Sequence, residues 1–132
     1  MTEKTRYTCI DCNEYAQRAA HVSIMGFQSK HPDWKIISEH GAEKLRKQYT
    51  FSVFDAAINF AEQLVYLGRE EGHHPVIRLE RNTMRVFVTW WTKEIKGIHN
   101  NDLMLAGHTD NLFNSRSINM WSDGLPAIPG EA

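Results

Sequence analysis

Two adjacent histidines followed by a proline, His73-His74-Pro75, are the residues in this sequence best suited to proton transfer. Imidazole titrates near neutral pH, so it can both donate and accept a proton under ordinary conditions. Neighbouring side chains on an extended segment point to opposite sides, so the two rings can reach different atoms of one bound molecule. The triplet alone is also typical of a solvated loop, and the local sequence leaves both interpretations open.

A second candidate for chemistry is the pair Cys9 and Cys12, which forms a C-x-x-C motif. A structural zinc site usually takes four ligands, and this pair would have to recruit His21 or His31 to approach that number. A thioredoxin-like redox site needs a strand before the pair, and the residues that precede it make a poor strand. We therefore expect two reduced thiols and no metal site, with a local metal or redox role as the alternative.

Composition places the chain among ordinary globular domains and argues against two classes of partner. The 132 residues suit one domain, and the formal net charge of -1 provides no basic excess for nucleic acid. No apolar run approaches the roughly 18 residues that a membrane span needs. The N-terminal residues lack the apolar core of a signal peptide. We therefore expect a cytoplasmic protein that binds neither nucleic acid nor membrane.

The first half of the chain predicts a helix, a hairpin and a second helix. Apolar residues at three- and four-residue spacing favour a helix over 14–27, which a following proline ends. Strands are expected over 34–38 and 45–51, joined by a turn. Ser52 then begins the clearest helix of the sequence, in a capping box of the S-x-x-D type, and Gly72 ends it.

The second half predicts another hairpin and a last helix. The segments VIRLE and MRVFVTWW read as two strands joined by a turn, and in the second one Val86, Val88 and Trp90 share one face. Asn100 or Asn101 is expected to cap the final helix, which we expect to end near residue 113.

These elements predict an α+β fold in the order helix, strand, strand, helix, strand, strand, helix. Two hairpins make a four-stranded antiparallel sheet, and all three helices can cover one face of it. We expect an N-terminal segment over 1–13, one domain over 14–114 and an irregular tail over 115–132. The other face of the sheet would leave Phe87 and Trp91 exposed unless a second subunit covers them, so we expect at least a dimer.

Several motifs at fixed separations add a family resemblance to this outline. They are PDWKI, FSVFDAAINFAEQL, EEGHHP, VFVTWW and KGIHNNDLMLAGHTD, which together span roughly residues 32–113. The sequence resembles the pterin-4a-carbinolamine dehydratase family, also known as the dimerization cofactor of a homeodomain transcription factor. The resemblance implies the same α-β-β-α-β-β-α fold, assembled as a homodimer or homotetramer.

The resemblance also implies a chemistry that uses no metal and no cofactor. Family enzymes dehydrate 4a-hydroxytetrahydropterins and thereby restore the cofactor of aromatic amino acid hydroxylases. Three histidines and one aspartate line the family's pocket, and the first two histidines and the aspartate match His73, His74 and Asp102. The pterin-binding positions then include Pro75, Trp90, Trp91 and Lys93.

Three motif positions depart from the family pattern, and each carries a basic residue. The third histidine is replaced by Lys93, or by Trp91 if the chain is counted forward without a gap. The acidic residue expected four positions before the first histidine is Arg69, and the aromatic residue expected six positions after the proline is Arg81. We expect the loss of the third histidine to limit proton transfer. We expect the two arginines either to alter the charge of the pocket or to turn to solvent.

Two functional interpretations follow from the altered motif. The favoured one is a family member that kept the scaffold, lost the chemistry and acts as a binding or assembly protein. Relatives with eroded motifs are Rubisco assembly factors of α-carboxysomes, so this interpretation suggests the Rubisco large subunit as a partner and a carboxysome-associated location. The alternative is an active 4a-hydroxytetrahydrobiopterin dehydratase, a hydro-lyase, that still binds pterin.

Overall fold

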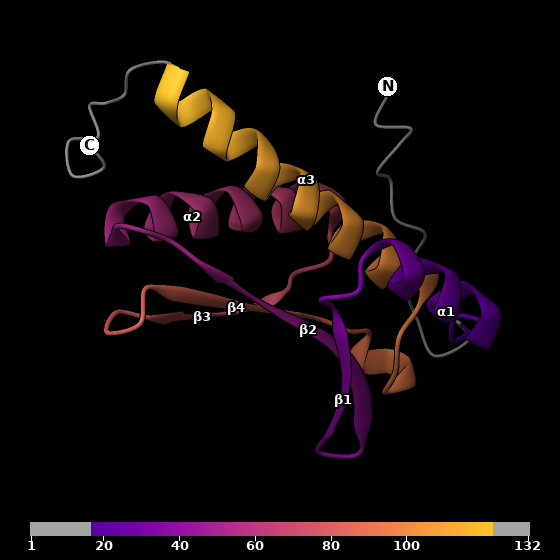
Figure 1. The fold of residues 1–132 in the computed structure, drawn as a ribbon. Coiled ribbons are helices and arrows are strands. Elements are labelled where there is room, and N and C mark those ends of the chain that lie inside the picture. The colour runs from indigo at the N-terminus through magenta and orange to yellow at the C-terminus, as the bar shows by residue number, and fades with distance from the viewer. Residues whose placement is uncertain (1–16, 123–132) are drawn as a thin grey trace.

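The computed structural model describes residues 17–122 and, within them, the side chains of residues 17–115. It contains three α-helices, four strands and one short 3-10 turn (Figure 1). In chain order they are α1 (His21–Lys30), β1 (Lys35–Glu39), β2 (Ala42–Thr50), α2 (Phe54–Glu71), β3 (Val76–Glu80), β4 (Arg85–Trp90), η1 (Lys93–Ile95) and α3 (Asn100–Ser122). The order predicted from the sequence is confirmed.

The four strands form one antiparallel sheet in the order β1-β2-β4-β3. The helices lie above one face of this sheet and leave the other face open, as Figure 1 shows. In β4 the alternation predicted from the sequence holds, because Val86, Val88 and Trp90 are fully buried against the helices. The α+β fold with its helices on one side is therefore confirmed.

The hydrophobic core fills the space between the sheet and the helices. Its largest fully buried side chains come from every layer: Trp34, Leu45, Phe60, Leu64 and Leu105 each have no exposed surface. Burying a side chain of this size contributes about 1.5–3 kcal/mol. The core therefore holds α2 and α3 against the sheet, and these two helices with β4 are the elements that position the histidine motif.

Helix α1 begins and ends later than the sequence predicts. Residues 17–20 are not helical, the helix starts at His21, and it continues to Lys30 rather than ending at Phe27. None of its residues is fully buried. Because the helix presents no buried stripe, the spacing of its apolar residues was a weak guide to its limits.

The predicted start of α2 is wrong, whereas its end is confirmed. The helix begins at Phe54 with Val53 at the capping position, and no side chain caps it, so the predicted box of Ser52 and Asp55 does not form. At the other end Gly72 adopts a left-handed conformation with φ of 67°. Glycine takes up this conformation without the steric cost that other residues pay.

Helix α3 is longer than predicted and has a different cap. It runs to Ser122, so the expectation of an irregular tail is wrong for residues 115–122. The N-terminal segment with Cys9 and Cys12, and the chain beyond Ser122, lie outside the described residues. Among residues 17–122, no helix is long and apolar enough to cross a membrane.

Candidate functional site

His73 and Asp102 form the centre of the candidate site. His73 Nε2 lies 2.7 Å from Asp102 Oδ1, and their side chains are 12% and 0% exposed. The imidazole also stacks on the indole of Trp90, with ring centroids 5.9 Å apart and planes 10° from parallel. Since one face of the ring and one nitrogen are both engaged, the orientation of His73 is fixed by the protein.

The second oxygen of Asp102 is held by the start of α3. His99 caps this helix, because its Nδ1 accepts a hydrogen bond from the backbone N–H of Asn101 at 2.9 Å. Asp102 Oδ2 in turn accepts from the backbone N–H of His99 at 2.9 Å, which completes a capping box. The predicted cap by Asn100 or Asn101 is therefore wrong.

A buried threonine hydroxyl completes the shell of this carboxylate. Thr92 Oγ1 donates to Asp102 Oδ2 at 2.7 Å, and neither residue has exposed surface. Both hydrogen bonds to Oδ2 use Asp102 as an acceptor, which is the role a carboxylate takes at the start of a helix. In the tautomer with its proton on Nε2, His73 donates to Oδ1, and Nδ1 is the nitrogen that can accept a proton.

His74 lies on the other side of the backbone and is exposed. Its imidazole packs close to α2 at Gly68, where a side-chain carbon would sit 2.8 Å from His74 Nδ1. The backbone N–H of His73 also donates to the carbonyl of Gly68 at 3.1 Å. Gly68 therefore lets the histidine segment lie directly on the helix, a role that sequence reasoning missed.

The two tryptophans assigned to pterin binding lie on opposite faces of the sheet. Trp90 is a core residue whose Nε1 donates to Thr109 Oγ1 at 2.9 Å, and only its contact with His73 connects it to the site. Trp91 lies on the open face, where Lys44 Nζ is 4.3 Å from the ring centroid. Pro75 is half-buried at the start of β3. The structure thus brings His73, Trp90 and Asp102 together and places Trp91 elsewhere.

Lys93 lies on an exposed turn directly after Thr92. Backbone hydrogen bonds between Thr92 and Gly97 close this turn, and Arg18 fastens it by donating to the carbonyl of Ile95 at 2.9 Å. Thr92 contacts Asp102, whereas Lys93, the next residue, is exposed to solvent. The resemblance implies the third histidine of the family at Lys93, or at Trp91 if the chain is counted forward without a gap.

The two arginines at altered motif positions are also exposed. Arg69 lies on α2, with its guanidinium carbon 5.2 Å from the ring centroid of Tyr66. Arg81 lies in the turn between β3 and β4. Of the two expectations for these residues, their exposure agrees with side chains that turn to solvent.

Comparisons with known proteins show the family to which this chain belongs. The model of the family described as "Pterin 4 alpha carbinolamine dehydratase" matches residues 16–112. The chain belongs to the pterin-4a-carbinolamine dehydratase family. It is 39% identical over 113 residues to a protein of Syntrophotalea carbinolica named "Putative pterin-4-alpha-carbinolamine dehydratase", a match that covers 86% of this chain and 99% of the relative.

A second relative and a solved structure also support membership of the pterin-4a-carbinolamine dehydratase family and its fold. A relative from Nitrosococcus oceani with the same name is 36% identical, over 86% of this chain and 98% of its own length. A crystal structure of a transcriptional coactivator/pterin dehydratase from Brucella melitensis superposes with a TM-score of 0.63 and 21% identity, over 73% of this chain and 98% of that one. This last comparison supports the fold.

A second, part-buried polar cluster joins α3 to the sheet and to the residues just after α1, and no pattern in the sequence predicts it. Asp110 accepts hydrogen bonds from Lys47 Nζ at 2.7 Å, from Trp34 Nε1 at 3.3 Å and from Tyr49 Oη, and His31 Nδ1 lies 2.7 Å away. Burial acts to raise the pKa of Asp110, but the hydrogen bonds from Lys47, Tyr49 and His31 together lower that pKa below its usual value. Burial and the neighbouring carboxylate raise the pKa of Tyr49 above its ordinary range.

Metal binding gains no support from the described part of the chain. Within residues 17–122, no group of three or more histidine, cysteine, aspartate or glutamate side chains is placed to hold a metal ion. The arrangement around His73 instead suits proton transfer by an oriented imidazole.

Proposed function

We propose that this chain is a dehydratase-family protein with a reduced active site, and that it acts as a binding or assembly protein rather than as an efficient enzyme. The observation that supports this proposal is the exposed Lys93 at the position of the family's third histidine. Dehydration of a 4a-hydroxytetrahydropterin needs two proton transfers, one from a ring nitrogen and one to the departing hydroxyl. Lysine is a poor substitute for the imidazole at this position, because imidazole can both donate and accept a proton near neutral pH.

The pair of His73 and Asp102 supports a retained pterin site. With Nε2 directed to Asp102, Nδ1 of His73 can take one proton from a bound pterin. His74 can approach the same ligand from the other side of the chain. We therefore expect pterin binding with dehydration slowed by roughly 10²–10⁴, the usual contribution of one acid–base group.

The alternative function is an active 4a-hydroxytetrahydropterin dehydratase that recycles the pterin of aromatic amino acid hydroxylases. It is favoured by the complete hydrogen-bond shell of Asp102, which orients His73 as an acid–base catalyst requires. The steady-state rate at which the purified protein dehydrates a 4a-hydroxytetrahydropterin distinguishes the binding function from the enzymatic one. A rate near the uncatalysed background supports the binding function, whereas efficient turnover contradicts it and establishes the enzyme.

The partners in this proposal come from family resemblance. We expect a homodimer or homotetramer in the cytoplasm, and light scattering that gives a mass near 15.3 kDa at micromolar concentration would contradict this. The Rubisco large subunit of α-carboxysomes is the proposed assembly client. Co-elution of the two purified proteins tests that client, and separate elution would remove it.

A further inference from the structure

The open face of the sheet, on the side away from the helices, carries an excess of positive charge. The strand register assigns to this face five cationic side chains and two carboxylates. The cations are Lys35, Lys44, Arg46, Arg78 and Arg85, and the carboxylates are Glu39 and Glu80. The face is therefore clearly basic, although the whole chain has a net charge of -1.

Aromatic rings on this face are covered by cations of the same chain. The guanidinium carbon of Arg78 lies 4.0 Å from the ring centroid of Phe87, and Lys44 Nζ lies 4.3 Å from that of Trp91. Both rings are half-buried, because these cations cover part of each ring on the open face where the sequence predicts them. The result is a surface on which apolar and cationic groups alternate, held in place by cation–π contacts.

Hydrogen bonds fix the centre of the face. Arg46 donates from Nε to Thr89 Oγ1 at 2.8 Å and from its two terminal nitrogens to Glu39 at 3.1 and 2.9 Å. The bonds from Arg46, with a further one from Lys44, lower the pKa of Glu39 to about 2, so this carboxylate stays ionised. A partner that binds here meets side chains that are already ordered and so loses less conformational entropy on binding.

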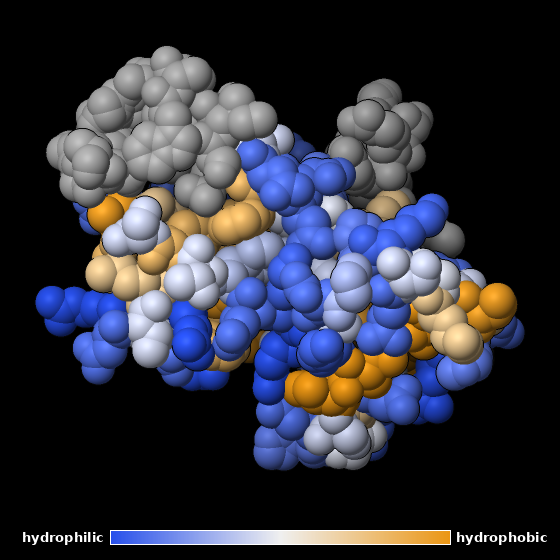
Figure 2. Space-filling view, in the orientation of Figure 1, coloured by the Kyte–Doolittle hydropathy of each residue, from blue (hydrophilic) through white to orange (hydrophobic). Residues whose placement is uncertain are grey.

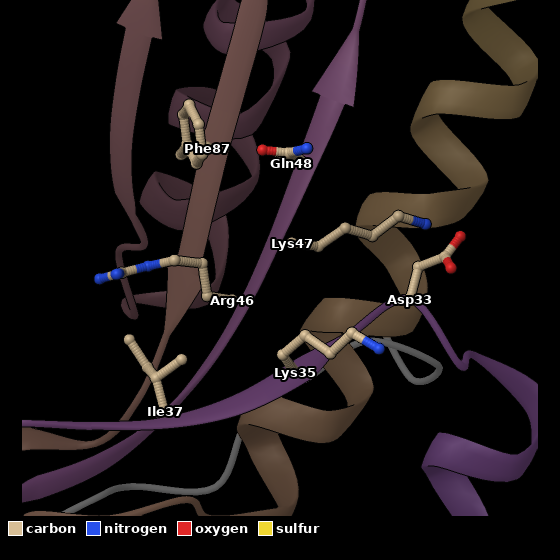
Figure 3. Close-up of a pocket in the computed structure, with 7 residues that line it drawn as sticks. All are labelled: Asp33, Lys35, Ile37, Arg46, Lys47, Gln48 and Phe87. Carbon is tan, nitrogen blue, oxygen red and sulfur yellow. The ribbon is translucent and has the colours of Figure 1, made fainter.

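A groove of about 490 Å³ runs along this face between β1, β2 and β4 (Figure 3). Ile37 and Phe87 give it apolar walls, and Lys35 and Arg46 line it with positive charge. Gln48 lines it on the same face, and Lys47 and Asp33 close it beyond the first residue of β1. Lys47 pairs there with Asp110, and Asp33 adds one negative charge to the lining. In Figure 2 a hydrophobic strip crosses the lower centre of the molecule between hydrophilic groups, where Figure 1 places β1.

We propose that this groove docks an extended acidic polypeptide segment in which aliphatic or aromatic side chains alternate with carboxylates. Carboxylates would pair with Lys35 and Arg46, and the apolar side chains would rest on Ile37 and Phe87. A second copy of the same face is disfavoured because like charges would oppose each other. Nucleic acid is the other anionic class of partner, and the DNA decamer in the test below distinguishes it from a peptide.

The docking surface is separate from the histidine site. His73 stacks on the buried, helix-facing side of β4 at Trp90, whereas Phe87 and Thr89 face the open side. An occupant of the groove therefore does not touch the pterin site. The proposal stands whether or not the chain dehydrates pterins.

The test is titration of the full chain into a fluorescein-labelled ten-residue peptide that alternates Glu with Leu and Phe, followed by fluorescence anisotropy. We expect saturable binding that weakens as salt rises. Lys35→Glu should weaken it about tenfold or more, because one attraction becomes a repulsion. Gln48→Glu should also lower the affinity for the peptide, because it adds a negative charge to the groove. Arg69→Glu makes the same charge change as Lys35→Glu on α2, away from this face, and should leave the affinity unchanged.

Several results would overturn the proposal. They are the absence of saturable binding, equal binding of a peptide with Lys in place of every Glu, and equal effects of Lys35→Glu and Arg69→Glu. Tighter binding of a single-stranded DNA decamer would assign the face to nucleic acid instead. A dimer that Lys35→Glu dissociates or strengthens would assign it to a second copy of this chain.

Discussion

Replacement of Thr92 by valine should destabilise the protein far more than the loss of one ordinary hydrogen bond. Valine has nearly the shape of threonine, so the change removes the hydroxyl donor and leaves packing almost unaltered. Thr92 Oγ1 donates to Asp102 Oδ2 at 2.7 Å in a fully buried setting. A hydrogen bond to a buried charged group contributes about 1.5–3 kcal/mol, and we expect the free energy of unfolding to fall by that amount.

The chain offers a matched control for this substitution. Thr83 Oγ1 donates to Glu80 Oε1 at 2.8 Å, a bond of similar length between exposed groups. Thr83→Val should therefore change the free energy of unfolding by no more than about 0.5 kcal/mol. A second control, Thr92→Ser, keeps the donor and removes only a methyl group, at a cost of about 1 kcal/mol.

Urea unfolding followed by tryptophan fluorescence measures all three variants against the natural protein. NMR of the His73 ring adds a second readout. We expect the natural protein to carry its proton on Nε2, and Thr92→Val to weaken that preference because Asp102 loses one of its restraints. If Thr92→Val and Thr83→Val cost the same, or Thr92→Ser costs as much as Thr92→Val, then the hydroxyl does not hold the carboxylate and the reasoning fails.

Three further predictions concern the site and the core. Lys93→His should partly restore dehydration of a 4a-hydroxytetrahydropterin, measured as the steady-state rate against Lys93→Gln, and an equal gain in both variants would contradict a role for the imidazole. Gly68→Ala should displace His74, because the new carbon would lie 2.8 Å from His74 Nδ1. We expect the free energy of unfolding in urea to fall by about 1–3 kcal/mol. Unchanged stability and unchanged NMR signals of His74 would argue against this contact. The lowered pKa of Asp110 implies a contribution to stability that is complete above about pH 5 and lost as pH falls through the folded-state pKa. Asp110→Asn should therefore be less stable at pH 7 and show a smaller loss between pH 5 and pH 3, and an equal loss in both proteins would refute the assignment.

The parts of the fold that the sequence predicts are those with strong local periodicity. Residues of β4 alternate between core and open face, and Val86 and Trp90 are buried as that alternation requires. Helix α2 carries a broad apolar stripe and ends at a glycine, and both features can be predicted from the sequence. Helix α1 buries no residue completely, so its start could not be located from its side chains.

The second polar cluster and the cap of α3 depend on contacts that local sequence patterns do not indicate. Asp110 meets Lys47 and Tyr49 across 63 and 61 positions of the chain, and no local pattern indicates such a cluster. The cap at His99 was missed for a related reason. Imidazole is an uncommon capping group, and it serves here because Asp102 also binds the backbone N–H of His99.

The double role of Asp102 changes what its presence in the sequence means. This carboxylate caps α3, accepts from a buried threonine and contacts His73, so the fold needs it whether or not any pterin is dehydrated. Its presence is therefore weak support for catalysis. The side chain of Lys93 has no comparable contact among the described residues, and His74 is exposed and packs beside Gly68 of α2. We therefore expect the activity of Lys93→His to be more informative about the chemistry of this protein than that of any Asp102 variant.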